Sequence, residues 1–160
     1  MLHMEGIAHG KYASSSSAHH AGLGIFDVEY KSPRVCGGYL SRQMSVTDLK
    51  GGAFSSSTTV VTGEGDTQIL DFTSLTASDG KFASGMYEAG PQTFDITEPY
   101  GVDEFMFFLE GRVTLTSADG SAVTVGAGEA VTIPKEWTGR WQTAGYRKIW
   151  VIYSADGSGP

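Results

Sequence analysis

Two glutamates and a tyrosine, Glu98, Tyr100 and Glu104, are spaced at even intervals in the chain. Even spacing places side chains on one face of a β-strand, although Pro99 and Gly101 indicate a turn that interrupts the pattern. Two carboxyl groups held together in an apolar cavity repel one another, so one stays protonated and acts as an acid while the other acts as a base. These three residues are therefore candidates for catalytic proton transfer. The alternative is that Glu98 lies on a solvated turn and that Glu104 is a hydrogen-bonded structural residue.

The composition excludes several classes of protein. The chain has 160 residues, of which 40% are apolar and 18% charged, and this fits a single packed domain. Because the net charge is -7 without any basic run, we expect no nucleic acid and no membrane as partners. The only cysteine, Cys36, excludes an intrachain disulfide and a multi-thiolate metal site. It is compatible with a reducing compartment, and we expect a cytoplasmic protein because the first residues lack a signal-peptide pattern.

The elements that position these side chains are predicted to be β-strands. Glycine accounts for 22 residues, which is about twice its usual share, and short β-branched and aromatic runs alternate with Gly, Ser and Asp clusters. This pattern is typical of an all-β sandwich or barrel. The predicted strands are residues 25–30, 35–40, 57–62, 67–72, 81–89, 92–97, 104–109, 112–117, 122–125, 130–133, 139–143 and 147–153.

Turn and capping residues predict one helical turn and two hairpins. Residues 45–50 are expected to be helical, with Ser45 as the N-cap and Asp48 in the capping-box position. Gly111 and Gly120 supply the positive φ that a tight turn requires. We therefore expect a hairpin at each glycine and a meander of three successive strands.

Three segments of the chain form a spaced pattern: DEFMFFLEG at 103–111, GEAVTIP at 128–134 and WTGRW at 137–141. They resemble the two motifs of the cupin superfamily, and more narrowly its small ureidoglycine aminohydrolase-like and ethanolamine-utilisation-type members. Six residues separate Glu104 from Gly111, and sixteen separate Gly111 from Gly128. Five more separate Gly128 from Pro134. The resemblance covers residues 85–154 and implies an RmlC-like jelly-roll β-barrel, in agreement with the strand pattern.

The histidines of metal-binding cupins are missing from these motifs. The positions that correspond to three histidine ligands hold Glu98, Tyr100 and Gly139. All four histidines of the chain lie in its first 20 residues. We therefore expect no bound metal and no other cofactor. Two routes to a metal stay open: a magnesium-like ion on Glu98, Glu104 and Tyr100, or a site completed by His19 and His20.

The same placement implies an aromatic pocket. Trp137, Gly139 and Trp141 share strand parity, so two indoles face inward beside the space that an imidazole would fill. Further candidate wall residues are Tyr87, Phe94 and Phe108. The arginines expected to point outward are Arg112, Arg140 and Arg147, so no inward cation is predicted. The alternative is that the aromatic residues simply fill the barrel core.

Two functions remain open from the sequence. The first is a metal-independent metabolic enzyme that acts on a small polar metabolite through Glu104 with Tyr100 or Glu98. The second is a non-catalytic ligand-binding or assembly cupin that has lost its metal site. We expect a short N-terminal arm at residues 1–23 and one cupin domain at 24–160. A homodimer is expected because the edge strands need cover and the arm has no core of its own.

Overall fold

The computed structural model describes residues 41–157. The predicted arm, the predicted strands 25–30 and 35–40, His19, His20 and Cys36 lie outside this part of the chain. In chain order the elements are α1 (Val46–Leu49), η1 (Gly52–Ser55), β1 (Val60–Thr62), η2 (Gly65–Thr67), β2 (Ile69–Thr76), β3 (Phe82–Ala89), β4 (Gln92–Ile96), β5 (Asp103–Ser117), β6 (Ala122–Gly126), β7 (Ala130–Ile133) and β8 (Gly139–Tyr153). The all-β prediction is confirmed.

The eight strands form one antiparallel sheet in the order β1-β2-β3-β8-β5-β6, with β4 paired to β8 and β7 paired to β5. Strands β5 and β8 are each 15 residues long and pair with one another along almost their whole length. The first half of β5 also pairs with β7 and its second half with β6. Likewise β8 pairs first with β4 and then with β3.

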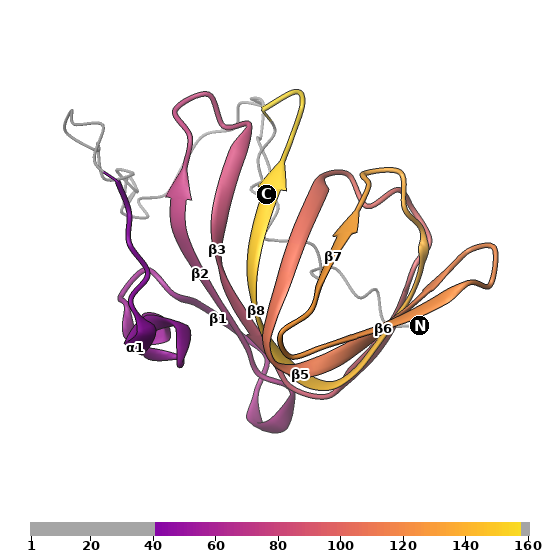
Figure 1. The fold of residues 1–160 in the computed structure, drawn as a ribbon, viewed down its shortest axis with the longest axis horizontal. Helices are drawn as coiled ribbons and strands as arrows, with labels where there is room; N and C mark the ends of the chain where they lie inside the picture. Colours follow the sequence, from indigo (N-terminus) through magenta and orange to yellow (C-terminus); the bar gives the residue numbers. More distant parts are fainter. Residues whose placement is uncertain (1–40, 158–160) are drawn as a thin grey trace, which may run out of the picture.

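Because β5 and β8 bend at their midpoints, the sheet folds into two layers that face one another (Figure 1). One layer contains β1, β2, β3 and β7 with one half of each long strand, and the other contains β4 and β6 with the other halves. The sequence predicted four short strands where the structure has these two long ones. Within residues 41–157 the two layers do not close into a complete barrel.

The bend depends on two glycines that come into contact. Gly111 has φ +70°, and a Cβ atom added to it would lie 2.0 Å from the carbonyl oxygen of Gly145. The pairing register of β5 shifts on both sides of this point, and β-bulges of this kind bend a strand. The predicted hairpin at Gly111 is therefore wrong: the positive φ is present, but the chain continues as one strand. The predicted three-strand meander is wrong for the same reason.

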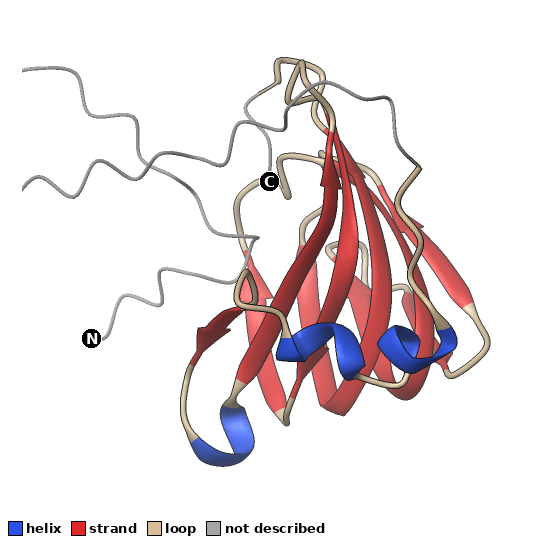
Figure 2. Cartoon of the chain, turned by 90° about the vertical axis from the view of Figure 1, so that its left-hand side faces the viewer, coloured by secondary structure: helices blue, strands red, loops and turns tan. Residues whose placement is uncertain are grey.

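The second predicted turn and the helical turn are both confirmed. Gly120 has φ +86°, and the N–H of Ser117 donates to the carbonyl of Ser121 at 2.8 Å, closing the β5–β6 hairpin. At α1 the Ser45 side chain accepts from the N–H of Asp48, whose carboxylate accepts from the N–H of Ser45. Figure 2 shows the short helices on the outside of the sheet.

The core lies between the two layers, and this space is called the interior below. Its side chains come mainly from the inward positions of β3, β5 and β8, because alternate residues of a strand point to the same face. The largest fully buried ones include Trp150, Phe108 and Met106. No helix among residues 41–157 is long and apolar enough to cross a membrane.

Candidate functional site

A buried ion pair lies in the interior. Glu104 of β5 is fully buried and Lys148 of β8 is 2% exposed. The ammonium nitrogen Nζ of Lys148 donates to Oε1 of Glu104 at 2.7 Å and lies 3.0 Å from Sδ of Met106. A lone charge in this position would be strongly unfavourable, whereas two opposite charges in contact compensate much of each other's lost hydration.

Tyr100 completes the hydrogen bonding of the same carboxylate. It lies in the segment between β4 and β5, and its N–H donates to the carbonyl of Trp137 at 3.1 Å. Its hydroxyl donates to Oε2 of Glu104. Burial, and after it the charge and hydrogen bond of Glu104, raise the pKa of Tyr100 well above its usual value. Tyr100 therefore stays protonated and acts as a donor to the carboxylate.

Aromatic rings surround the ammonium group. Nζ of Lys148 lies 5.2 Å from the ring centroid of Trp141, 5.4 Å from that of Tyr87 and 5.8 Å from that of Tyr146. Within about 6 Å, the negative face of an aromatic ring attracts a cation. The rings thus supply further compensation for the charge of Lys148 without adding a second carboxylate.

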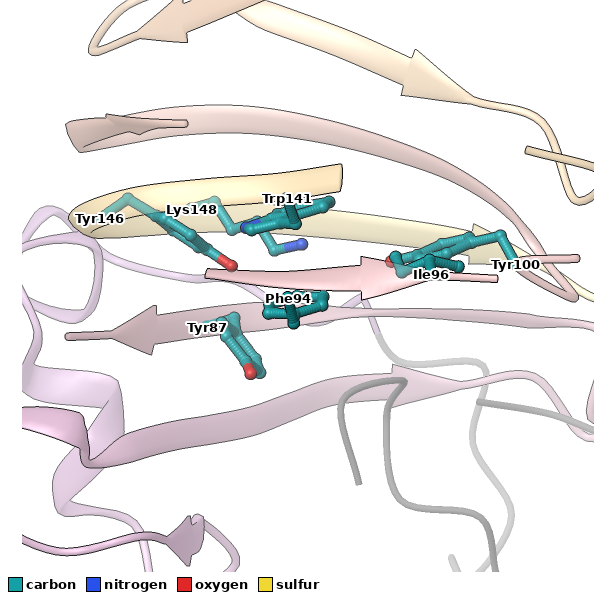
Figure 3. A pocket seen from close by; sticks show the side chains of 7 residues that line it. All are labelled: Tyr87, Phe94, Ile96, Tyr100, Trp141, Tyr146 and Lys148. Atoms are coloured by element: carbon teal, nitrogen blue, oxygen red, sulfur yellow. The ribbon is translucent and has the colours of Figure 1, made fainter. Parts of the chain in front are cut away.

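A small cavity adjoins this cluster. Its volume is about 10 Å³, which is about the space that one water molecule needs. The residues that line it are Tyr87, Phe94, Ile96, Tyr100, Trp141, Tyr146 and Lys148. Figure 3 shows the ammonium of Lys148 and the hydroxyl of Tyr146 pointing into the space beside Trp141 and Phe94. An apolar wall with a few polar groups is the usual composition of a small-molecule site.

The structure brings together some of the predicted site residues and separates others. Glu104, Tyr100, Tyr87, Phe94 and Trp141 all contribute to the cluster or its cavity. Glu98 is exposed on the bend that follows β4, which corresponds to the alternative of a solvated turn. The two carboxylates do not form a pair, because the segment with Pro99 and Gly101 interrupts the strand parity.

Two more predicted wall residues lie outside the cavity lining. Phe108 is fully buried in the core, with its ring edge-on to Tyr146 at 5.3 Å between centroids. Trp137 is half-buried, and its indole N–H donates to Oγ of Ser117 at 3.1 Å. Its ring packs edge-on against Tyr100, with 6.4 Å between the ring centroids. Trp137 therefore contacts the cluster through Tyr100 and does not line the cavity.

The expected vacant space beside Gly139 does not exist. A Cβ atom at Gly139 would lie 2.2 Å from the carbonyl oxygen of Thr116 and 2.7 Å from Cζ2 of Trp137. The neighbouring strand and the Trp137 indole fill the volume that the sequence argument assigned to an imidazole. The cavity therefore lies elsewhere, beside Trp141 and Lys148.

Lys148 is the candidate site residue that the sequence reasoning missed. The prediction of no inward cation is wrong, although Arg140 does point outward and pairs with Asp95 at 2.7 Å. The sequence feature that could have revealed Lys148 is an alternation in β8, where Tyr146, Lys148 and Trp150 occupy successive inward positions. The inward parity changes between Thr143 and Tyr146 at the bulge in β8, so parity counted from residue 139 did not extend to residue 148.

The residues present do not fit the metal ion of other cupins. Glu104 already accepts from an ammonium group and a phenol, and the ammonium would repel a cation placed beside the carboxylate. Among residues 41–157, no three His, Cys, Asp or Glu side chains come together as a possible ion site. Glu98 is too exposed to complete one with Glu104.

Comparison with protein families matches residues 76–149 to the EutQ-like cupin domain. The chain is a small cupin-type protein. The matched residues contain the whole of β5 and β7 and most of β8, which together hold Glu104 and Lys148. No curated protein matches this cupin.

Solved structures resemble this cupin over part of its length. A protein of unknown function from Rhizobium leguminosarum bv. viciae is 25% identical, with 72% of this chain and 98% of that chain covered and a TM-score of 0.51. A DUF861 family protein from Pseudomonas syringae pv. tomato is 21% identical, with 59% and 43% covered and a TM-score of 0.52, and it supports the fold alone. The EutQ protein of Clostridium difficile is 27% identical, with 56% and 70% covered and a TM-score of 0.47.

Proposed function

We propose that this cupin binds a small polar metabolite, part of which enters the interior cavity, without a metal ion. The observation that carries the proposal is the buried cluster of Lys148, Glu104 and Tyr100 beside an aromatic-walled cavity. A buried charged pair at a cavity is a candidate functional site because the same groups are expensive to bury for stability alone. The EutQ-like domain match supports the proposal, since the cluster lies within the matched residues.

We propose further that the cluster moves a proton in a metal-independent enzyme. Lys148 lines the cavity, whereas Glu104 lies behind it. The ammonium is placed to give a proton to a ligand oxygen, and Glu104 supplies the counter-charge. Tyr100 is a positioning residue rather than the acid, because its raised pKa disfavours loss of the phenolic proton.

A non-catalytic ligand-binding cupin is the second candidate, and the size of the cavity favours it. A volume of about 10 Å³ admits no whole metabolite, and both oxygens of Glu104 already accept hydrogen bonds. A ligand would therefore lie mainly at the mouth, against Phe94 and Ile96, and no reaction would follow.

A ligand screen followed by product analysis tests the proposal. Protein purified without added metal is screened by thermal shift against carboxylic acids, sugars and ureido compounds, in parallel with the double variant Lys148→Met, Glu104→Gln. We expect at least one compound to raise the melting temperature of the wild type and not that of the variant. Proton NMR of that compound after incubation then separates the candidates: a changed spectrum supports the enzyme, and an unchanged one the binding protein. If the screen finds no compound that binds selectively to the wild type, both candidate functions are contradicted.

A further inference from the structure

The polar groups that face the interior cavity are hydrogen-bond donors. The ammonium of Lys148 has three N–H bonds, of which one is directed to Glu104 and one to Met106. The third has no acceptor among the described residues. Lys148 is one of the residues that line the cavity, and Figure 3 shows its ammonium group pointing into the space beside Trp141.

The indole of Trp141 contributes a second donor. Trp141 is 3% exposed, and its buried Nε1 makes no hydrogen bond of normal geometry within residues 41–157. An indole nitrogen can only donate. A buried donor without a well-formed hydrogen bond is rare and costs about 1–3 kcal/mol. The Tyr146 hydroxyl interacts with this indole N–H, but not with normal hydrogen-bond geometry, so a better-placed acceptor at the cavity wall would be favourable.

Tyr146 contributes a third donor. Burial, and after it the charges of Tyr87 and Glu104, raise the pKa of the Tyr146 hydroxyl well above its usual value. The indole of Trp141 opposes this rise, but it does not make a hydrogen bond of normal geometry to the hydroxyl. The phenol therefore keeps its proton, and Figure 3 shows its oxygen directed to the same side as the Lys148 ammonium.

We propose that the cavity holds one oxygen atom of a carboxylate ligand, with the N–H groups of Lys148 and Trp141 and the hydroxyl of Tyr146 as its donors. The inference rests on the proposed function and names its ligand class. Converging donors match an oxygen acceptor, and hydrogen bonds to a charged acceptor are about twice as strong as neutral ones. The cavity has room for one oxygen, so the rest of the ligand lies against Phe94 and Ile96.

Titration of the tryptophan side chains by NMR tests this inference. In a ¹⁵N–¹H spectrum the three indole N–H groups, those of Trp137, Trp141 and Trp150, give separate signals, and Trp141→Phe assigns the one from Trp141. Propionate and its uncharged amide, propionamide, are the probes at pH 7. We expect propionate to shift the Trp141 signal in a saturable manner, with at least tenfold weaker binding of propionamide. Trp137, whose indole bonds to Ser117, is the internal control.

Two variants separate the donors from general charge effects. Tyr146→Phe removes one donor and is expected to weaken propionate binding at least fivefold. Arg140→Met removes an exposed cation that is paired with Asp95 and is expected to leave the binding unchanged. Equal binding of the two probes, a linear response, or no shift would overturn the carboxylate inference. If a sugar or ureido compound then shifts the Trp141 signal, the proposed function is kept and only the carboxylate inference fails. If no compound shifts that signal, the proposed function and the carboxylate inference both fail.

Discussion

At the scale of single residues, Lys148 is the cation of the interior, and it contacts both the carboxylate and the aromatic rings there. The resemblance to metal-binding cupins makes Glu104 a candidate metal ligand, but in this structure its carboxylate contacts the ammonium group of Lys148 at 2.7 Å. The aromatic rings around Nζ and the hydroxyl of Tyr100 complete the environment of the pair. Removing one member of a buried pair costs more than removing both, because an uncompensated charge then remains in the interior.

Tyr100→Phe tests the hydrogen bond to Glu104. The variant keeps the ring that packs against Trp137 and removes only the donor to the carboxylate. We expect the free energy of unfolding to fall by about 1.5–3 kcal/mol, the range for hydrogen bonds to charged groups. Urea denaturation measures the change. Tyr153→Phe is the matched control, because Tyr153 is 49% exposed; equal effects in both variants would contradict the assignment.

The buried phenols predict a loss of stability at alkaline pH. The pKa values of Tyr87, Tyr100 and Tyr146 are raised in the folded protein, chiefly by burial. Below a pH of about 10, the ordinary pKa of tyrosine, both states keep the proton and stability is unaffected. Above it the unfolded chain releases protons that the folded chain retains, so the free energy of unfolding falls as pH rises. Absorbance at alkaline pH is expected to show these three phenols ionising only as the protein unfolds. If all tyrosines ionised while the protein was still folded, this prediction would be wrong.

At the scale of elements, the sequence predicted strand positions well and strand continuity poorly. The range 130–133 of β7 and the capping box of α1 match the structure because local propensity and side-chain hydrogen bonds determine them. Gly111 was interpreted as a hairpin turn because a positive φ serves both a turn and a bulge. Its contact with Gly145, 34 positions later in the chain, decides between them, and no local pattern contains that contact. The change of inward parity before Lys148 was missed for the same reason, because it depends on the pairing of β8 with the distant strand β5.

Gly111→Ala tests the close contact at the bend. The added methyl group would lie 2.0 Å from the carbonyl oxygen of Gly145, so the two long strands would have to separate. Gly120→Ala is the control, since Gly120 has a similar positive φ of +86° with open space around it. We expect the control to lose about 1–2 kcal/mol from backbone conformation alone and Gly111→Ala to lose clearly more in thermal or urea unfolding. Equal losses would show that the contact is unimportant.

At the scale of the whole molecule, three aromatic side chains are exposed on the outer face of the β3-β8-β5 layer. Phe82, Phe105 and Tyr153 are 38%, 42% and 49% exposed. Phe82 is paired with Tyr153, and Phe105 with Val151, in neighbouring strands. Aromatic side chains have about 150–250 Å² each, so these three expose about 250 Å². A stable interface buries about 800 Å² per partner, so these side chains would form about a third of one, and we propose that a second copy of the chain covers this face.

Phe105→Glu tests the dimer. A charge in the middle of the apolar face is expected to prevent association, so analytical ultracentrifugation at micromolar concentration should find a dimer for the wild type and a monomer for the variant. Val123→Glu places the same charge at a residue of β6 that is 48% exposed outside this face, and it should remain dimeric. A monomeric wild type would refute the dimer, and a Phe105→Glu variant that stays dimeric would refute this interface. If a chain lacking residues 1–40 became dimeric where the full chain was monomeric, the N-terminal segment would be the occupant instead.

The most direct measurement of the central claim is a double-mutant cycle on Lys148 and Glu104. The free energies of unfolding are measured in urea for the wild type, Lys148→Met, Glu104→Gln and the double variant. Each single variant is expected to lose about 3–5 kcal/mol because it leaves one charge buried without its partner. The double variant should lose less than the sum of the two, with a coupling of at least about 1.5 kcal/mol. Losses that add within about 0.5 kcal/mol would show that the two charges do not stabilise one another, and would contradict a Lys148–Glu104 pair as the centre of the site.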